Sequence, residues 1–144
     1  MRKENLKKFF SEIQVLKRIK HEGWRLAGIE NPDSIAEHAF CAAQIAYVLG
    51  KMEGADAAKC AVMSLFHDNE ETRVGDHHKV AARYLEWKKG SDEARREHFE
   101  NLPPEIAKEI LALQAEKGRR DTKEGVVAKD ADWFEVAIQA KIYI

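Results

Sequence analysis

Apolar residues recur every three or four positions through most of this chain, and no segment alternates apolar with polar residues. Helical spacing places apolar side chains on one face of an α-helix, whereas alternation would indicate a half-buried strand. The pattern therefore predicts an all-α fold, an α-helical bundle. With 144 residues the chain can bury one core of ordinary size, so we expect a single domain over residues 1–144.

Start and stop signals divide this pattern into helices. In "PDSIAEH", Ser34 and Glu37 have the spacing of a capping box, which predicts a helix from there to about Met52. The other expected elements are a first helix from Leu6 to Ile19, a loop over 21–33, a third helix capped by Asp56, short helices over 80–87 and 93–99 with a turn at 88–92 between them, a helix over 101–118 and a last helix over 126–144.

Composition narrows the classes of partner. With a formal net charge of -1, the chain lacks the excess of basic residues that is typical of proteins that bind nucleic acid polymers. We therefore expect no nucleic acid polymer as a partner. The longest apolar runs fall far short of the roughly 20 residues of a spanning helix, so we expect no membrane association and a cytoplasmic location. Cys41 and Cys60 lie in apolar helical segments without a CxxC pair, which predicts that both are small core residues.

The stretch "SLFHDNEETRVGD", residues 64–76, places titratable groups directly after an apolar run. Ionised carboxylates are costly to bury unless they are paired or bound to a metal. If the preceding helix continues through this stretch, His67, Asp68 and Glu71 share one face. An imidazole beside a carboxylate suits a divalent metal, and a further carboxylate one turn on could move a proton to or from water.

Other segments offer partners for this group. His38 shares a helical stripe with apolar residues, which directs it inward either as a hydrogen-bonded core histidine or as a metal ligand. The last helix offers Asp130 and Asp132, which lie on nearly opposite faces. Apolar residues surround both, so periodicity does not decide between them, and either could be a charge that the helix dipole favours.

Four segments, "EGWRLAGI", "NPDSIAEH", "LFHDNEETRVGD" and "VAKDADWFE", follow one another in this order. Together they resemble the HD-domain phosphohydrolase superfamily, and more closely its 5'-deoxynucleotidase-like branch, over about Leu16 to Gln139. Four ordered segments are far more specific than a His-Asp dipeptide alone. The resemblance implies one divalent transition metal (Mn, Co, Fe, Ni or Zn, with Mg as a further option), Glu71 as the catalytic carboxylate, and four metal ligands: His38, His67, Asp68 and Asp132.

The resemblance also implies contacts with substrate. Asp76 matches a carboxylate near the bound nucleotide, and Trp24 matches an aromatic residue that packs by the sugar. Trp24 could equally be a partly buried aromatic residue that closes the first helix onto the core. Among the basic residues near the motifs, we expect Arg25 to contact the substrate because it follows Trp24 in the loop.

The resulting expectation is a metal-dependent phosphomonoesterase that releases phosphate from deoxyribonucleoside 5'-monophosphates. Gly23, where relatives can carry arginine, and the lack of a Pro-rich stretch after Asp76 depart from the branch. These departures leave open an HD-type hydrolase of another nucleotide or of a pyrophosphate. A separate alternative is a non-catalytic nucleotide-binding helical module, against which the presence of Glu71 and of all four ligand-type residues argues. The family resemblance and the apolar C-terminal run also suggest a homodimer.

Overall fold

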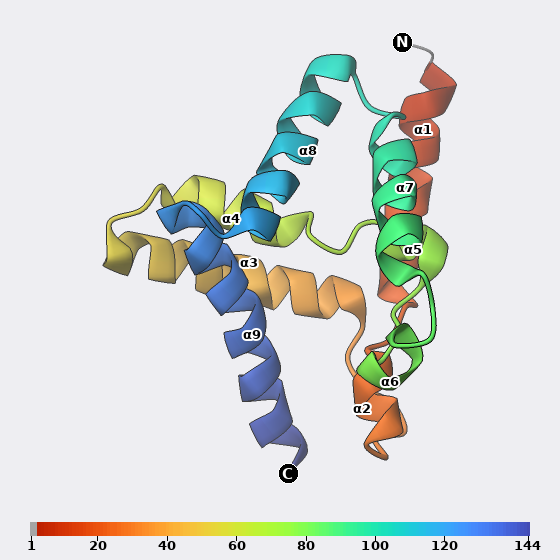
Figure 1. Ribbon diagram of the computed structural model, residues 1–144, viewed down its shortest axis with the longest axis vertical. Coiled ribbons are helices and arrows are strands. Elements are labelled where there is room, and N and C mark those ends of the chain that lie inside the picture. Colours follow the sequence, from red (N-terminus) through yellow and green to blue (C-terminus); the bar gives the residue numbers. More distant parts are fainter. Residues whose placement is uncertain (1–2) are drawn as a thin grey trace. The chain divides into compact units, whose positions relative to one another are not determined.

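A computed structural model of the chain describes residues 3–144 (Figure 1). Helices make up the regular structure of this part, and its residues form no strand beyond one isolated bridge between Lys20 and Ser34. The all-α prediction is confirmed. Among the described helices, none combines the length and the apolar character that crossing a membrane requires. That one domain extends over residues 1–144 stays a prediction.

The chain folds into two units, each defined by its own internal contacts. One unit runs to Ala36 and resumes over Asp68–Ala107, and the other comprises Glu37–His67 and Lys108–Ile144. In chain order the elements are α1 (Lys3–Glu12), the 3-10 helix η1 (Ile13–Lys17), α2 (Glu22–Leu26), α3 (Ile35–Glu53), α4 (Ala57–Leu65), α5 (Glu71–Val74), α6 (Lys79–Ala82), α7 (Trp87–Phe99), α8 (Pro104–Arg119) and α9 (Lys123–Tyr143).

In the first unit, α5 packs against α7 and η1 around a buried polar network. His98 is fully buried, its ring stacks 4.7 Å from that of Phe9, and its Nδ1 donates to Glu12 over 2.6 Å. Arg73 donates to Glu12 and to Glu97, each over 3.0 Å. Burial alone would raise the pKa of Glu12, but hydrogen bonds from His98 and Arg73 lower it below its usual value. This network ties α1 to α5 and α7.

The segment over 21–33 contains helix α2, so the prediction of a simple loop there is wrong. Backbone pairing closes the base of this segment, because Ile35 N donates to Ile19 O over 2.8 Å and His21 N donates to Asp33 O over 3.1 Å. The side chains of His21 and Asp33 also pair, 2.9 Å apart. These contacts hold the two ends of the segment together, and α2 lies between them.

The predictions for residues 80–99 are partly wrong. The short helix ends at Ala82, and α7 runs without a break through the predicted turn at 88–92. Ser91 in that turn is buried, and its Oγ donates to Glu70 over 3.3 Å. Tertiary contact therefore overrides the weak helix propensity of Gly90 and Ser91.

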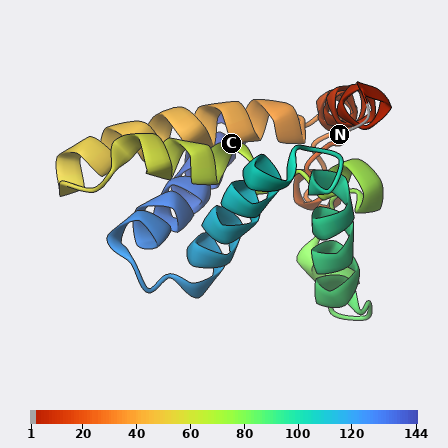
Figure 2. The ribbon, with the colours of Figure 1, turned by 90° about the horizontal axis from the view of Figure 1, so that it is seen from above.

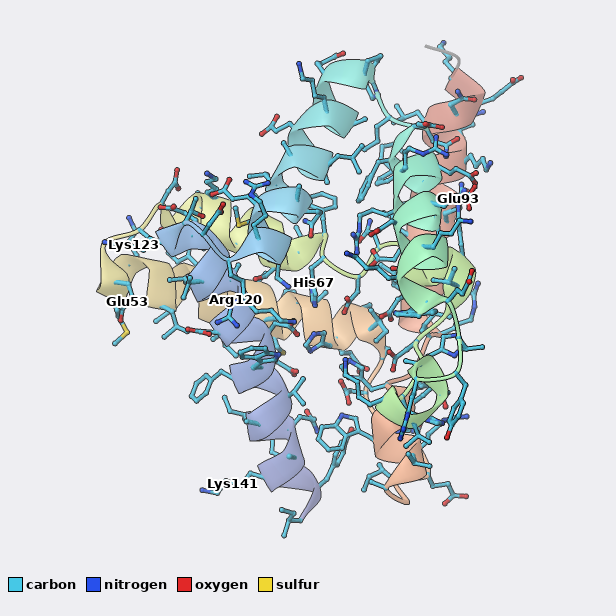
Figure 3. The ribbon with its side chains drawn as sticks, viewed as in Figure 1. Glu53, His67, Glu93, Arg120, Lys123 and Lys141 are labelled. Atoms are coloured by element: carbon cyan, nitrogen blue, oxygen red, sulfur yellow. The ribbon has the colours of Figure 1, made fainter. Side chains whose placement is uncertain are left out.

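In the second unit, α3 and α4 run side by side, as Figures 1 and 2 both show. Gly50 permits the close approach, since a Cβ there would lie 2.9 Å from Ala57 Cα. Helix α9 packs on α4, and these helices bury a common core made of Ala46, Cys60, Val127 and Ala131. Figure 3 shows Lys123 beside Glu53, whose backbone oxygen accepts from Lys123 Nζ over 3.2 Å.

The two cysteines differ in environment. Cys60 is fully buried in this core, as expected, whereas Cys41 is exposed and its predicted core position is wrong. Helix α3 carries apolar residues on its buried and its exposed sides alike, for example Phe40, which is 63% exposed. Apolar neighbours in the sequence therefore did not identify which face of α3 is buried.

Candidate metal site

Three side chains converge in the second unit from three places in the chain. His38 lies in the first turn of α3 and is only 1% exposed, as its inward stripe predicted. Asp132 lies near the middle of α9. His67, which is labelled in Figure 3, follows the end of α4. Both are buried as well. Residues distant in sequence thus meet inside one unit.

Their ligand atoms lie close together. His38 Nε2 is 3.2 Å from His67 Nε2 and 3.1 Å from Asp132 Oδ1, and His67 Nε2 is 3.5 Å from the same carboxylate oxygen. The three residues form a group whose candidate ligand atoms all lie within 4.8 Å of one another. Two imidazole nitrogens and one carboxylate oxygen therefore face a common point.

The far nitrogen of each imidazole is fixed by a hydrogen bond. His38 Nδ1 donates to Glu135 Oε2 over 2.5 Å, and His67 Nδ1 donates to the backbone oxygen of Ser64 over 2.5 Å. A histidine whose Nδ1 is protonated and bonded presents the Nε2 lone pair to a metal. The geometry thus favours Nε2 as the ligand atom of both histidines.

Two lysines hold the second oxygen of Asp132. Lys129 Nζ lies 2.9 Å and Lys117 Nζ 3.3 Å from Asp132 Oδ2, and Lys117 is itself buried. Burial alone would raise the pKa of Asp132. Without a metal, hydrogen bonds that His38 and His67 donate from Nε2, together with the positive charges nearby, lower this pKa far below its ordinary value, and a bound metal would take the place of those protons. Asp132 is therefore ionised, with Oδ1 directed to the histidines.

The helix before His67 ends earlier than the sequence pattern suggested. Helix α4 ends at Leu65, and Phe66 leaves the helical conformation with φ -102° and ψ 2°. In a continued helix, the Ser64 oxygen would accept from the amide of residue 68, but here it accepts from the amides of Phe66 and His67 and from the His67 imidazole. The premise that His67, Asp68 and Glu71 share one face of a continuous helix is therefore wrong.

The donor set fits a divalent metal. Imidazole nitrogen combined with carboxylate oxygen suits Mn, Fe, Co, Ni and Zn, and the described group contains no thiolate. A closed structural zinc site typically uses four ligands, often cysteines, whereas these three leave coordination positions for water or substrate.

Asp130 and Asp132 have different environments, although local periodicity did not distinguish them. The side chain of Asp130 is 52% exposed and pairs with Arg120 over 3.2 Å. Asp132 is buried beside both histidines. The structure thus brings His38, His67 and Asp132 together, as the resemblance implied, and their service as metal ligands stays a prediction.

The remaining candidates lie in the other unit, and their roles also stay predictions. Asp68 directly follows His67 in the chain and is partly exposed. Glu71 is the first residue of α5 and is 7% exposed. Its neighbour Glu70 is buried in an ion pair with Arg95, which donates to both of its carboxylate oxygens.

The three candidate substrate residues meet around α2. Asp76 Oδ2 accepts from the backbone amide of Glu22 over 2.7 Å, which fixes the start of α2. Trp24 is half-buried within this helix, and Arg25 is exposed with its Nε 3.8 Å from Glu22 Oε1. Asp76 therefore anchors the segment that carries Trp24 and Arg25.

Sequence reasoning assigned no role to Glu135, Lys129 or Lys117. A local signal existed for the first two, because Lys129, Asp132 and Glu135 are spaced by three residues and so share one face of α9. Lys117 lies on α8, and only the tertiary fold reveals that it pairs with Asp132.

Fold and site together define an all-α protein with a centre of histidines and an aspartate for a divalent metal. The chain belongs to the HD domain family, whose model matches residues 13–144.

Individual relatives agree with this assignment. The chain is 33% identical to 5'-deoxynucleotidase HDDC2 of Dictyostelium discoideum, with 96% of this chain and 77% of the relative covered. Identity to 5'-deoxynucleotidase HDDC2 of Homo sapiens is 28%, over 96% of this chain and 68% of that protein.

Solved structures are similar as well. A conserved hypothetical protein from Pyrococcus furiosus superposes with a TM-score of 0.81 at 28% identity, covering 94% of this chain and 80% of that one. A protein described as a predicted metal-dependent phosphohydrolase, from Magnetospirillum magnetotacticum, gives a TM-score of 0.77 at 26% identity, covering 94% and 69% respectively.

Proposed function

We propose that this chain is a metal-dependent 5'-deoxynucleotidase, which hydrolyses deoxyribonucleoside 5'-monophosphates to the deoxyribonucleoside and phosphate. The observation that carries the proposal is the convergence of His38, His67 and Asp132. It occurs in a chain that is 33% identical to a protein named for this activity.

In this proposal, the ligands are His38 Nε2, His67 Nε2, Asp132 Oδ1 and a carboxylate oxygen of Asp68. A divalent transition metal, when bound, supplies Lewis acidity that polarises phosphoryl oxygens and makes water a better nucleophile at neutral pH. The Ser64 carbonyl orients the His67 imidazole, while Lys117 and Lys129 hold the other oxygen of Asp132. These contacts preorganise the donor atoms before a metal arrives.

Hydrolysis breaks the bond between phosphorus and the sugar O5', and forms a bond between phosphorus and the oxygen of water. One proton of that water must reach O5' of the leaving deoxyribonucleoside. We assign this transfer to the Glu71 carboxylate, by its match to the catalytic carboxylate of the resembling family.

Substrate recognition is assigned to the segment around α2. Trp24 offers an aromatic face for the deoxyribose, and Arg25 offers a guanidinium for the phosphate. Asp76 contributes by fixing the backbone at Glu22, two residues before Trp24. Because one Asp76 oxygen holds this amide, the substrate would meet a segment that is already ordered.

We include a homodimer and a cytoplasmic location in the proposal. Phe134, Ile138 and Ile142 recur every four residues on α9 and are 53%, 41% and 69% exposed. Such an apolar stripe is typical of a helix that packs against another. Light scattering after size-exclusion chromatography should give twice the chain mass of 16.4 kDa, and a Phe134→Glu variant should give the single mass. A monomer at micromolar concentration would contradict the dimer.

The proposed activity is tested by phosphate release. The protein is stripped of metal, resupplied with Mn, Co, Ni, Zn or Mg in turn, and given matched ribo- and deoxyribonucleoside 5'-monophosphates. We expect release that depends on the metal and is faster for the deoxy substrates. Silence across the whole panel, with one metal bound per chain, would contradict the proposed activity.

A further inference from the structure

We propose that Glu135 is a positioning residue that sets which nitrogen of His38 faces the metal and strengthens that nitrogen as a ligand. Glu135 is neither a proposed metal ligand nor the proposed proton carrier. Its carboxylate instead accepts from His38 Nδ1 over 2.5 Å, on the far side of the imidazole. The inference uses the metal site of the proposed function but not its substrate.

Both residues of the His38–Glu135 hydrogen bond are buried. His38 is 1% exposed and Glu135 is 6% exposed, so little water can reach Nδ1 in place of the carboxylate. An imidazole carries one proton and one lone pair when neutral, and a bonded Nδ1–H leaves the lone pair on Nε2. Nε2 is the atom that lies near His67 and Asp132. Glu135 therefore selects the tautomer that can bind the metal.

The two histidines are held by acceptors of different charge. His67 Nδ1 donates to a neutral backbone oxygen, that of Ser64, whereas His38 Nδ1 donates to a carboxylate. A negative acceptor draws the Nδ1 proton toward itself and raises the electron density at Nε2, which makes His38 the more basic ligand. Loss of the Glu135 carboxylate should therefore lower metal affinity by about 10–100-fold, as is typical for residues that hydrogen-bond a metal-bound histidine.

Ligand and positioning residue also share one rigid element. Asp132 and Glu135 are one turn apart on α9 and point at the same histidine from two directions, through Nε2 and Nδ1. Because a single helix carries both, a shift of α9 would move the two contacts together. The imidazole plane of His38 is thus fixed relative to the aspartate that binds beside it.

The test is metal affinity of the Glu135→Gln variant, measured with Zn²⁺ in competition with a chromophoric chelator. Gln keeps the shape but loses the charge, and its amide can also donate to Nδ1, which would favour the wrong tautomer. We expect affinity about 10–100-fold below that of the parent protein, and a changed visible absorption spectrum of the Co²⁺-loaded form. Asp130→Asn is the matched control on the same helix and should change affinity less than about twofold, because that side chain is exposed.

A second variant separates positioning from simple stability. Glu135→Asp keeps the charge at shorter reach, and we expect its affinity to lie between those of the parent protein and Glu135→Gln. Unchanged Zn²⁺ affinity and an unchanged Co²⁺ spectrum in folded Glu135→Gln would overturn the proposal, even if its melting temperature falls. If Glu135→Gln does not fold, parent-like affinity in Glu135→Asp overturns it instead. None of these readouts uses phosphate release, so a failure of the proposed activity would be seen separately.

Discussion

The Glu71→Gln variant should release phosphate from a deoxyribonucleoside 5'-monophosphate about 10²–10⁴-fold more slowly than the parent protein, the range typical of a lost general acid or base. Glutamine is isosteric with glutamate but cannot deliver a proton to the leaving O5'. Metal content should remain near that of the parent protein, because Glu71 is not among the proposed ligands. Single-turnover kinetics and elemental analysis of the same preparation check both expectations.

The neighbouring Glu70→Gln variant is the matched control. Glu70 pairs with Arg95 and Ser91 inside its own unit. Burial raises the pKa of Glu70 although Arg95 opposes the shift. Replacing Glu70 by glutamine removes the charge that pairs with Arg95, so some loss of stability is expected, but no proposed catalytic step uses Glu70. We expect turnover near that of the parent protein. Equal losses of turnover in both variants would assign the effect to local unfolding, and loss of metal in Glu71→Gln would make Glu71 a ligand.

Local sequence signals predicted those elements whose ends are set by nearby side chains. Asp56 caps α4 by accepting from the Lys59 amide over 3.1 Å, as its position before an apolar run suggested. The end of α3 was predicted equally well, because Gly54 takes a positive φ of 66° just after the helix. Such contacts span three or four residues, so the sequence alone contains them.

Other features depend on contacts that no local pattern contains. At the end of α4 the Ser64 carbonyl accepts from the His67 imidazole as well as from amides of the turn, and the imidazole contact aims Nε2 at His38. Periodicity suggested a longer helix because it counts apolar positions and ignores competition for a backbone acceptor. The same stretch therefore contains a histidine that lies beside His38 and Asp132, but its local geometry differs from the prediction.

The choice between Asp130 and Asp132 shows a further limit of prediction from sequence. Both aspartates lie among apolar residues, so only the packing of α9 on α4 separates a buried carboxylate from an exposed one. The resemblance favoured Asp132, and the structure places it beside His38 and His67. Neither periodicity nor the family resemblance predicted the pairing of Asp132 with Lys117, because that lysine belongs to another helix.

Asp132→Asn should lower metal affinity by more than about 100-fold, beyond the range for outer partners, because it replaces a charged donor by a neutral one. It should also destabilise the metal-free protein. Lys117 is buried and would lose its charged partner, and breaking a buried pair typically costs about 3–5 kcal/mol. Zn²⁺ competition and thermal unfolding without metal measure the two effects separately.

Asp130→Asn is the control for this prediction, since it makes the same chemical change two residues away. Its partner Arg120 is exposed, and an exposed ion pair contributes only about 0–1 kcal/mol, so both affinity and stability should stay near those of the parent protein. The opposite pattern, with tight Zn²⁺ binding in Asp132→Asn and weak binding in Asp130→Asn, would exchange the roles of the two residues. Weak binding in both variants would instead indicate that α9 as a whole had shifted. The pair of variants thus tests the one ligand choice that periodicity left open.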